Sequence, residues 1–350
     1  ILLSALLVHT LFISFIWQTQ LNNIRSESYN NFLNDIQKDT SYVVNKLEGY
    51  AEILYGVRGL FAASEEVTHT EWDAYLQSIN VLERYKGITG VAFSFKVDAE
   101  DKEGFLQTLK KSYSNGSQVM EDITIFPEQA GSGSSFILSY LEPLDLTVNS
   151  VGYDLSTEPI RNSTILRSIE VGTIVATSPL KLIKDNGQIS YVTFLPVYKK
   201  ETDLQSSQSK LENTIGVISV AFNMKDTLDS LFLDYTNKDY LHLSALDLGE
   251  GSNSDTISIY ESNNLTTDMN ISHTIKFKIA ERYINFKFLT GDFYNTSPVI
   301  PRNTNIFFLF IMVAGYITLI VMYFRFRKVA LVYNDVKGIS DQKISEIINR

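Results

Sequence analysis

Histidine and acidic side chains are the first candidates for chemistry, because they supply metal ligands and general acids or bases. The four histidines share no ligand spacing: His9, His69, His242 and His273. The run "DAEDKEG" at 98–104 is similar in outline to a calcium loop, but a lysine takes a ligand position and Glu103 takes the glycine position. "GSGSS" at 131–135 and "GEG" at 249–251 lack a phosphate-loop or nucleophile-elbow context. We therefore predict no catalytic residue, no metal and no cofactor in this chain.

Polar side chains embedded in two apolar strands favour ligand binding instead. The segments "TIVATSPLKLI" (173–183) and "ISYVTFLPVYKK" (189–200) alternate like strands, and the "DNG" between them is a hairpin signal. A small-molecule pocket needs a few polar groups among apolar walls, and this hairpin could supply both. The candidate ligand-binding residues are Thr177, Ser178, Tyr191, Thr193 and Leu195.

Four further candidates precede the hairpin in the sequence: Phe93, Tyr140, Glu142 and Asp154. Glu142 and Asp154 are the acidic residues that could bind a donor-rich ligand. Structural alternatives stay open, because Asp154 could be a carboxylate favoured by a helix N-terminus, Tyr140 a core aromatic and Thr177 a residue that fills the sheet.

Short strands and helices must position these residues. A capping box of Thr68 and Glu71 predicts a helix that runs to about Leu82. The next segments predict a strand at 87–97, a helix at 99–113 and a strand at 134–143.

The run "LSTEPIRNSTILRSIEVG" at 155–172 predicts a helix. Ser156 or Thr157 would be its N-cap, Pro159 falls in the first turn, and Gly172 ends it. Its buried stripe would consist of Ile165, Leu166 and Ile169.

A polar segment at 201–213 separates this unit from a second one of the same style. The second unit is predicted as a strand at 215–224, a helix at 225–235 and four strands. The fold class is therefore α+β, with tandem PAS-like antiparallel-sheet subdomains, one membrane-distal and one membrane-proximal.

Two apolar segments bracket these units. Residues 306–324 carry no charge and are long enough to cross a bilayer, and we expect residues 1–17 to be the remainder of a truncated first span. Residues 21–61 show helical spacing, which predicts a long stalk helix. The basic "RFRK" at 325–328 predicts a cytoplasmic C-terminus in the inner (plasma) membrane, with residues 18–305 in the periplasm or outside the cell.

The predicted domains follow from these boundaries. They are a first transmembrane helix (1–17), a stalk helix (18–63), a distal sensor subdomain (64–205), a proximal subdomain (206–305), a second transmembrane helix (306–324) and a cytoplasmic helical linker to an output domain (325–350).

Composition narrows the partners. A net charge of −10 argues against nucleic acid, because neutralising phosphates requires clustered basic residues. The absence of cysteine excludes disulfides, thiolate metal sites and a cysteine nucleophile.

Several separate motifs resemble the CHASE domain, in that family's order. They are "FAASEEVTHTEWDAYL", "ITGVAFSFKV", "SYLEPLD", the run "GYDLSTEPIRNSTILRSIEVGTIVATSPLKLI" and "FLPVYKK", which together cover roughly residues 47–232. The family consists of extracytoplasmic sensory domains attached to histidine kinases, diguanylate cyclases and nucleotide cyclases. The resemblance implies a stalk helix that carries two PAS-like subdomains, with the ligand in the distal one.

The resemblance also bears on the ligand. In the plant cytokinin receptors of this family, the threonine of the Thr-Ser-Pro motif borders the hormone, and Thr177 matches it. Those receptors also use an acidic residue before the strand that corresponds to 134–143, where this chain has "GSGSS". An adenine ligand of the cytokinin type is therefore not expected.

We interpret the chain as a transmembrane sensor that binds a small molecule and forms a homodimer through its stalk and membrane helices. It would regulate a cytoplasmic enzyme, with a histidine kinase as our first expectation and a diguanylate cyclase as the second. The alternative is a structural or dimerisation module without a ligand of its own. Ligand-dependent stabilisation would separate the two interpretations.

Overall fold

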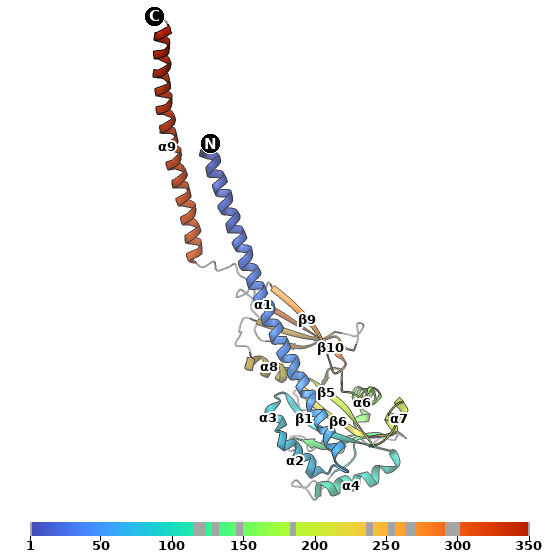
Figure 1. Cartoon of the computed structure of the whole chain (residues 1–350). Helices are drawn as coiled ribbons and strands as arrows, with labels where there is room; N and C mark the ends of the chain where they lie inside the picture. Colours follow the sequence, from blue (N-terminus) through green and yellow to red (C-terminus); the bar gives the residue numbers. More distant parts are fainter. Residues whose placement is uncertain are drawn as a thin grey trace. The chain divides into compact units, whose positions relative to one another are not determined.

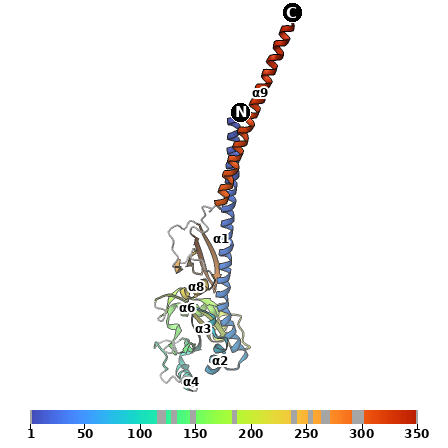
Figure 2. The ribbon, with the colours of Figure 1, turned by 90° about the vertical axis from the view of Figure 1, so that its left-hand side faces the viewer.

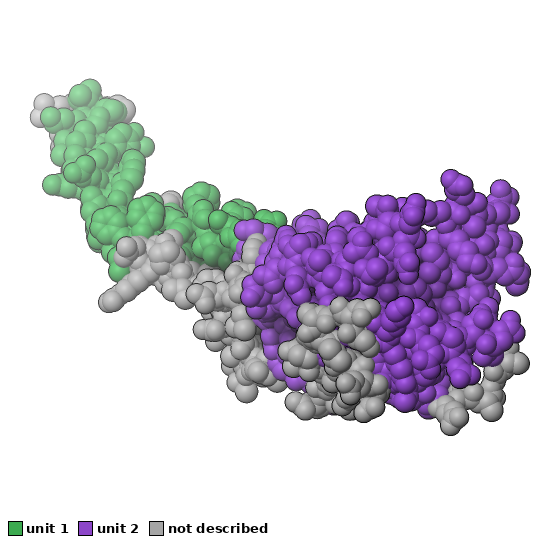
Figure 3. Space-filling view, turned by 90° about the horizontal axis from the view of Figure 1, so that it is seen from below, with its two compact units in different colours: residues 1–34, 291–350 green, residues 35–290 purple. Residues whose placement is uncertain are grey.

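The computed structural model describes residues 2–114, 123–127, 133–144, 150–182, 187–235, 241–250, 256–262, 271–290 and 302–348. The chain divides into two compact units, coloured separately in Figure 3: residues 1–34 together with 291–350, and residues 35–290. Most of the predicted "DNG" turn, Asp185 and Asn186, lies outside the described residues.

Helix α1 (Leu2–Ala63) is continuous, so the predicted stalk joins the first apolar segment without a break (Figure 1). Apolar residues at three- and four-residue spacing are buried along its second half: Ile36, Val43, Leu47, Leu54 and Val57. The predicted long N-terminal helix is confirmed. In Figures 1 and 2 this half of α1 passes beside one sheet and then beside the other.

The first unit pairs the beginning of α1 with helix α9 (Arg302–Ile348). The rings of His9 and Tyr316 lie 5.4 Å apart and those of Trp17 and Phe308 lie 4.9 Å apart, so the two helices run antiparallel. Helix α9 continues without a break through Gly338. Both helices are long and apolar enough to cross a membrane.

The second unit alternates helices and strands. Its elements after α1 are α2 (His69–Ile79), α3 (Val81–Arg84), β1 (Ile88–Val97), η1 (Ala99–Asp101), α4 (Lys102–Ser114), β2 (Ser135–Glu142), η3 (Leu155–Thr157), α6 (Pro159–Val171), β3 (Val175–Ala176), β4 (Leu180–Lys181), β5 (Ile189–Tyr198), α7 (Ser207–Glu212), β6 (Thr214–Asn223), α8 (Met224–Tyr235), β7 (Leu241–Asp247), β8 (Ile257–Glu261), β9 (Ile271–Ile279) and β10 (Arg282–Thr290).

These strands form two antiparallel sheets. The first sheet has the order β2-β1-β6-β5-β3, with β4 also paired to β5, and the second has the order β8-β7-β10-β9. Strand β6 lies at the centre of the first sheet, so assigning residues 215–224 to the predicted proximal subdomain was wrong. The second sheet begins with β7, and the predicted boundary at residue 205 falls too early to divide the two sheets.

One face of the first sheet, which we call the α6 face, carries the main core. Strand residues such as Phe136, Val192 and Phe194 join one buried cluster with Leu109 of α4 and Ile165 of α6. The opposite face, which we call the α1 face, carries Phe93 of β1, whose ring stacks on Phe61 of α1 with centroids 4.2 Å apart.

Helix α6 corrects two details of the sequence analysis. Its N-cap is Glu158, whose carboxylate accepts from the backbone N–H groups of Ile160 (3.0 Å) and Arg161 (2.8 Å), whereas Ser156 and Thr157 belong to η3. Pro159 in the first turn and Gly172 at the left-handed C-cap are confirmed. Leu166 is exposed, because the helix instead turns Thr164, Ile165, Ser168 and Ile169 inward.

Candidate functional site

Strand register places five of the nine predicted ligand-binding residues on the α1 face of the first sheet. Directly opposed residues of antiparallel strands share a face, and alternate residues of one strand do so too. Phe93 opposes both Tyr140 and Ile218, and Ile218 opposes Leu195. Tyr191 and Thr193 precede Leu195 at alternate positions of β5, so they share this face.

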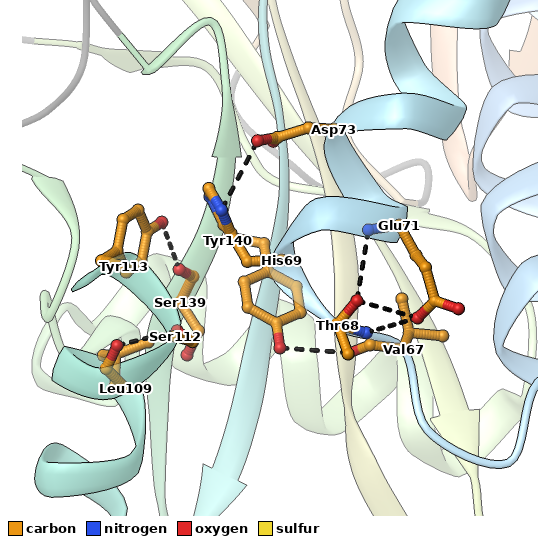
Figure 4. A network of polar contacts seen from close by, with 10 residues as sticks. All are labelled: Val67, Thr68, His69, Glu71, Asp73, Leu109, Ser112, Tyr113, Ser139 and Tyr140. Carbon is orange, nitrogen blue, oxygen red and sulfur yellow. Dashed lines mark hydrogen bonds and ion pairs between the residues drawn. The ribbon is translucent and has the colours of Figure 1, made fainter. Parts of the chain in front are cut away.

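Helix α2 covers the β1–β2 end of the α1 face with aromatic rings. Trp72 lies 5.9 Å from Tyr140 and 6.5 Å from Phe93 between ring centroids, and the side chains of all three are buried. The Tyr140 hydroxyl donates to the carbonyl of Val67 at 3.1 Å, just before the helix (Figure 4). Burial is the main cause that raises the pKa of Tyr140 to about 12, with Glu66 and Glu71 adding to it. Phe93 and Tyr140 therefore sit in a packed cluster.

The capping box predicted at the start of α2 is confirmed. The Thr68 hydroxyl accepts from the N–H of Glu71 at 3.3 Å, and the Thr68 N–H donates to the Glu71 carboxylate at 2.9 Å. The next residue, His69, is buried with its ring 4.2 Å from that of Tyr113 and 5.6 Å from that of Tyr140. Its Nδ1 lies 3.4 Å from a carboxylate oxygen of Asp73 (Figure 4).

Burial is the main influence on the pKa values of both His69 and Asp73. It lowers the pKa of His69, and the Asp73 carboxylate opposes that change. Burial likewise raises the pKa of Asp73, and His69 opposes it. The imidazole is consequently held in its neutral form at neutral pH.

Tyr191 ties the first sheet to the second. Its hydroxyl donates to Oδ2 of Asp247 at 2.6 Å, and Arg282 donates to both carboxylate oxygens of Asp247, from Nε at 2.8 Å and from Nη2 at 3.0 Å. Asp247 is fully buried, and Arg282 is 7% exposed. Burial, followed by the Asp247 charge, raises the pKa of Tyr191 well above its ordinary value. The predicted candidate Tyr191 is thus a link between the two sheets.

A cavity of about 350 Å³ lies beside this link. Tyr191 and Thr193 of the predicted set contribute to its wall, together with residues of α1 and of the β9–β10 hairpin. Thr193 is mostly buried, and its hydroxyl donates to the carbonyl of Val220 at 3.2 Å.

Thr177 lies on the α6 face of the first sheet. It follows β3 opposite Val192, a residue of the α6-face core. Its N–H donates to the Val192 carbonyl at 2.9 Å, and its hydroxyl accepts from the Val192 N–H at 3.1 Å. Thr177 is fully buried and the next residue, Ser178, is half-buried. The hairpin candidates therefore divide between the two faces.

The two acidic candidates lie at different positions. Glu142 ends β2, opposite Val91, and is half-buried. Asp154 is fully buried at the N-cap of η3, where its Oδ1 accepts from the N–H of Ser156 at 3.0 Å and its Oδ2 lies 3.7 Å from Nζ of Lys102. These contacts fit the capping interpretation of Asp154.

Sequence reasoning missed the Asp247–Arg282 pair and the buried position of His69 beside the rings of Tyr113 and Tyr140. The weak signals were an aspartate two residues before Gly249 and an arginine that opens a strand. Within the described ranges, no three His, Asp or Glu side chains gather closely enough to hold a metal ion.

Comparison with known families is consistent with this geometry. The family model of the CHASE domain matches residues 65–260, more than half of the chain, so the chain belongs to the CHASE-domain family. The match starts just before α2 and ends in β8, and therefore spans the whole first sheet. A CHASE domain is an extracellular sensor module of signalling proteins and is not catalytic. A search of curated proteins gave no significant match.

Proposed function

We propose that the chain is the sensing part of a transmembrane receptor, which binds a small molecule outside the membrane and regulates a cytoplasmic signalling enzyme. The observation that carries the proposal is a CHASE domain at residues 65–260 with a long apolar helix on each side in the sequence. A sensory module flanked by two membrane spans can detect a signal on one side of the membrane and pass it to the other side.

The exposure of the apolar helices supports the membrane assignment. Only 6% of the most apolar stretch of α1 is buried within the protein, and none of that of α9. Apolar surface of this extent is stable in lipid. Arg325, Arg327 and Lys328 follow the apolar part of α9, which favours a cytoplasmic C-terminus and a periplasmic or extracellular sensor.

We assign the two sheets to the proposed distal and proximal PAS-like subdomains. The distal one would extend through β6, and the proximal one would begin after it. Dimerisation through the stalk and membrane helices is part of the proposal, as is a histidine kinase, or failing that a diguanylate cyclase, beyond residue 350.

We place the sensed ligand at the distal sheet, next to Thr177. A hydroxyl that accepts one hydrogen bond still has a proton to donate, and Thr177 presents such a hydroxyl at the edge of an apolar core. Asp154, Glu142 and Ser178 are the further polar candidates of this region.

The experiment compares three variants of the full-length receptor. Thr177→Ile removes the hydroxyl and should abolish the response of the output enzyme, while Thr177→Ser keeps the hydroxyl and should preserve the response. Thr274→Ile, on an exposed position of β9, is the matched control and should respond normally. Melting curves verify that each variant is folded. A normal response of a folded Thr177→Ile variant would remove Thr177 from the site.

Melting curves also test the structural alternative, in which the domain has no ligand of its own. A ligand that binds only the folded state raises the melting temperature. If extracts that activate the receptor never raise the melting temperature of the CHASE domain, the structural or dimerisation module explains the chain better than a ligand-binding sensor does.

A further inference from the structure

The cavity beside Tyr191 is separate from the proposed sensory site. Its wall combines α1, the α1 face of the first sheet and the β9–β10 hairpin of the second sheet. Thr177 lies outside this wall, opposite a core residue of the other face. A volume of about 350 Å³ falls within the range of small-molecule sites.

The wall is mainly apolar. Leu47 and Leu54 come from α1, and Phe222 comes from β6 of the first sheet. Ile174 stands just before β3, and Ile284 and Phe286 come from β10. Phe222 remains half-exposed although it stacks on Tyr191 with ring centroids 5.7 Å apart. Apolar rings that border open space can gain contacts from an occupant.

Several polar side chains of the wall already have protein partners. Arg282 and Tyr191 both donate to Asp247, and Thr193 donates to Val220. Lys278 and Glu281, which also line the cavity, pair with each other at 3.0 Å. A charged occupant would therefore lose its hydration without gaining a free counter-charge from these groups.

The hairpin that closes the cavity has an uncommon backbone. Ala280 and Glu281 form the turn between β9 and β10 with φ angles of 45° and 70°. Such left-handed conformations favour glycine or asparagine, so two ordinary residues there need support from their surroundings. The carbonyl of Ala280 accepts from the N–H of Ala176 in β3 at 3.0 Å, which holds the turn against the first sheet.

We propose that this cavity is a second binding site, for an uncharged and largely apolar small molecule of about two fused rings. A cavity of about 150 Å³ takes one benzene, which sets the scale for this one. An occupant would touch both sheets and α1 at once, so it binds best when the two sheets are joined through Tyr191 and Asp247. This site adds to the proposed function and does not depend on it.

Indole is the probe, because it is uncharged, bicyclic and soluble, and indole-3-carboxylate is its anionic counterpart. The full chain in lipid nanodiscs is melted with and without each compound. A probe concentration about five times its Kd should raise the melting temperature by about 2–4 °C. The anion should give a much smaller shift.

A matched pair of variants locates the binding. Ala51→Phe fills the cavity from the half-buried side of α1, and Ala62→Phe adds the same ring at an exposed position of the same helix. The indole shift should persist in Ala62→Phe and disappear in Ala51→Phe. An equal shift in all three proteins, or none in the unmodified chain, overturns the proposal, and an equal shift with the anion overturns its ligand class.

A second measurement applies if Ala51→Phe does not fold. The chain has no cysteine, so Thr193→Cys places a single thiol in the cavity wall. Indole should slow its modification by a small neutral thiol reagent several-fold. An unchanged rate contradicts the proposal, whatever the outcome at Thr177.

Discussion

The two faces of the first sheet differ although they use the same strands. On β5, Val192 and Phe194 enter the closed core of the α6 face, while Tyr191 and Thr193 border a cavity on the α1 face. Helices α4 and α6 cover the α6 face. A helix and the second sheet together cover the α1 face. Adjacent residues of one strand thus face a packed core on one side and a cavity on the other.

The largest expected effect tests the closed face. Phe194→Ala should lower the free energy of unfolding by about 3–5 kcal/mol, because it leaves a cavity in a packed core. Its neighbour Thr193→Ala should cost no more than about 2 kcal/mol, since it removes one hydrogen bond beside existing space. Denaturant unfolding of both variants measures the difference. Equal losses would mean that the two faces are packed alike.

The link between the sheets should give the next largest effect. Asp247→Leu leaves Arg282 buried without its partner and should cost about 3 kcal/mol, near the lower end for broken buried pairs because Arg282 keeps 7% of its surface exposed. Adding Arg282→Met should restore much of the loss. The double variant is the control, and a loss that persists in it would show that Asp247 acts through other contacts.

His69 lies where helices of both faces meet, between Tyr113 and Tyr140. Its folded pKa is lowered from about 6.5, so below that pH the unfolded chain binds more protons and stability falls as pH drops. The slope should not exceed about 1.4 kcal/mol per pH unit. His69→Phe should flatten it between pH 7 and 5.5.

The acidic partner provides the control for this pH dependence. The pKa of Asp73 is raised, so its own contribution is present at low pH and is lost as pH rises through its folded pKa. An Asp73→Asn background removes that contribution. If the slope in this background is the same with His69 and with Phe at the position, His69 does not titrate as described.

The smallest effect concerns how α2 is fixed over the α1 face. Thr68→Ala removes a side-chain cap and should cost about 1 kcal/mol. Ser206→Ala removes the same kind of cap from α7, a six-residue helix, and should cost less. Melting temperatures compare the two. A larger loss at Ser206 would indicate that α2 contributes little to the cover of this face.

Local patterns were predictable because they depend on neighbouring residues. Alternation gave the strands, the capping box of Thr68 gave the start of α2, and Gly172 gave the end of α6. The cap at Glu158 was missed because serine and threonine are the commoner caps and stand just before it.

Long-range pairing could not be predicted in the same way. Strand β6 follows α7 in sequence yet inserts between β1 and β5, and alternation does not say which sheet a strand joins. Tyr191 and Asp247 are 56 positions apart, and Asp247 and Arg282 are 35. The link, and the cavity beside it, exist only once both sheets are assembled.

The central claim, a sensor outside the membrane with its output side inside, is tested most directly by single-cysteine labelling. Because the chain has no cysteine, Gln208→Cys on α7 and Ser340→Cys on α9 each provide one exposed thiol. In sealed spheroplasts, a membrane-impermeant maleimide should label residue 208 at once and residue 340 only after lysis. Labelling of residue 340 before lysis, or protection of residue 208, would contradict the account.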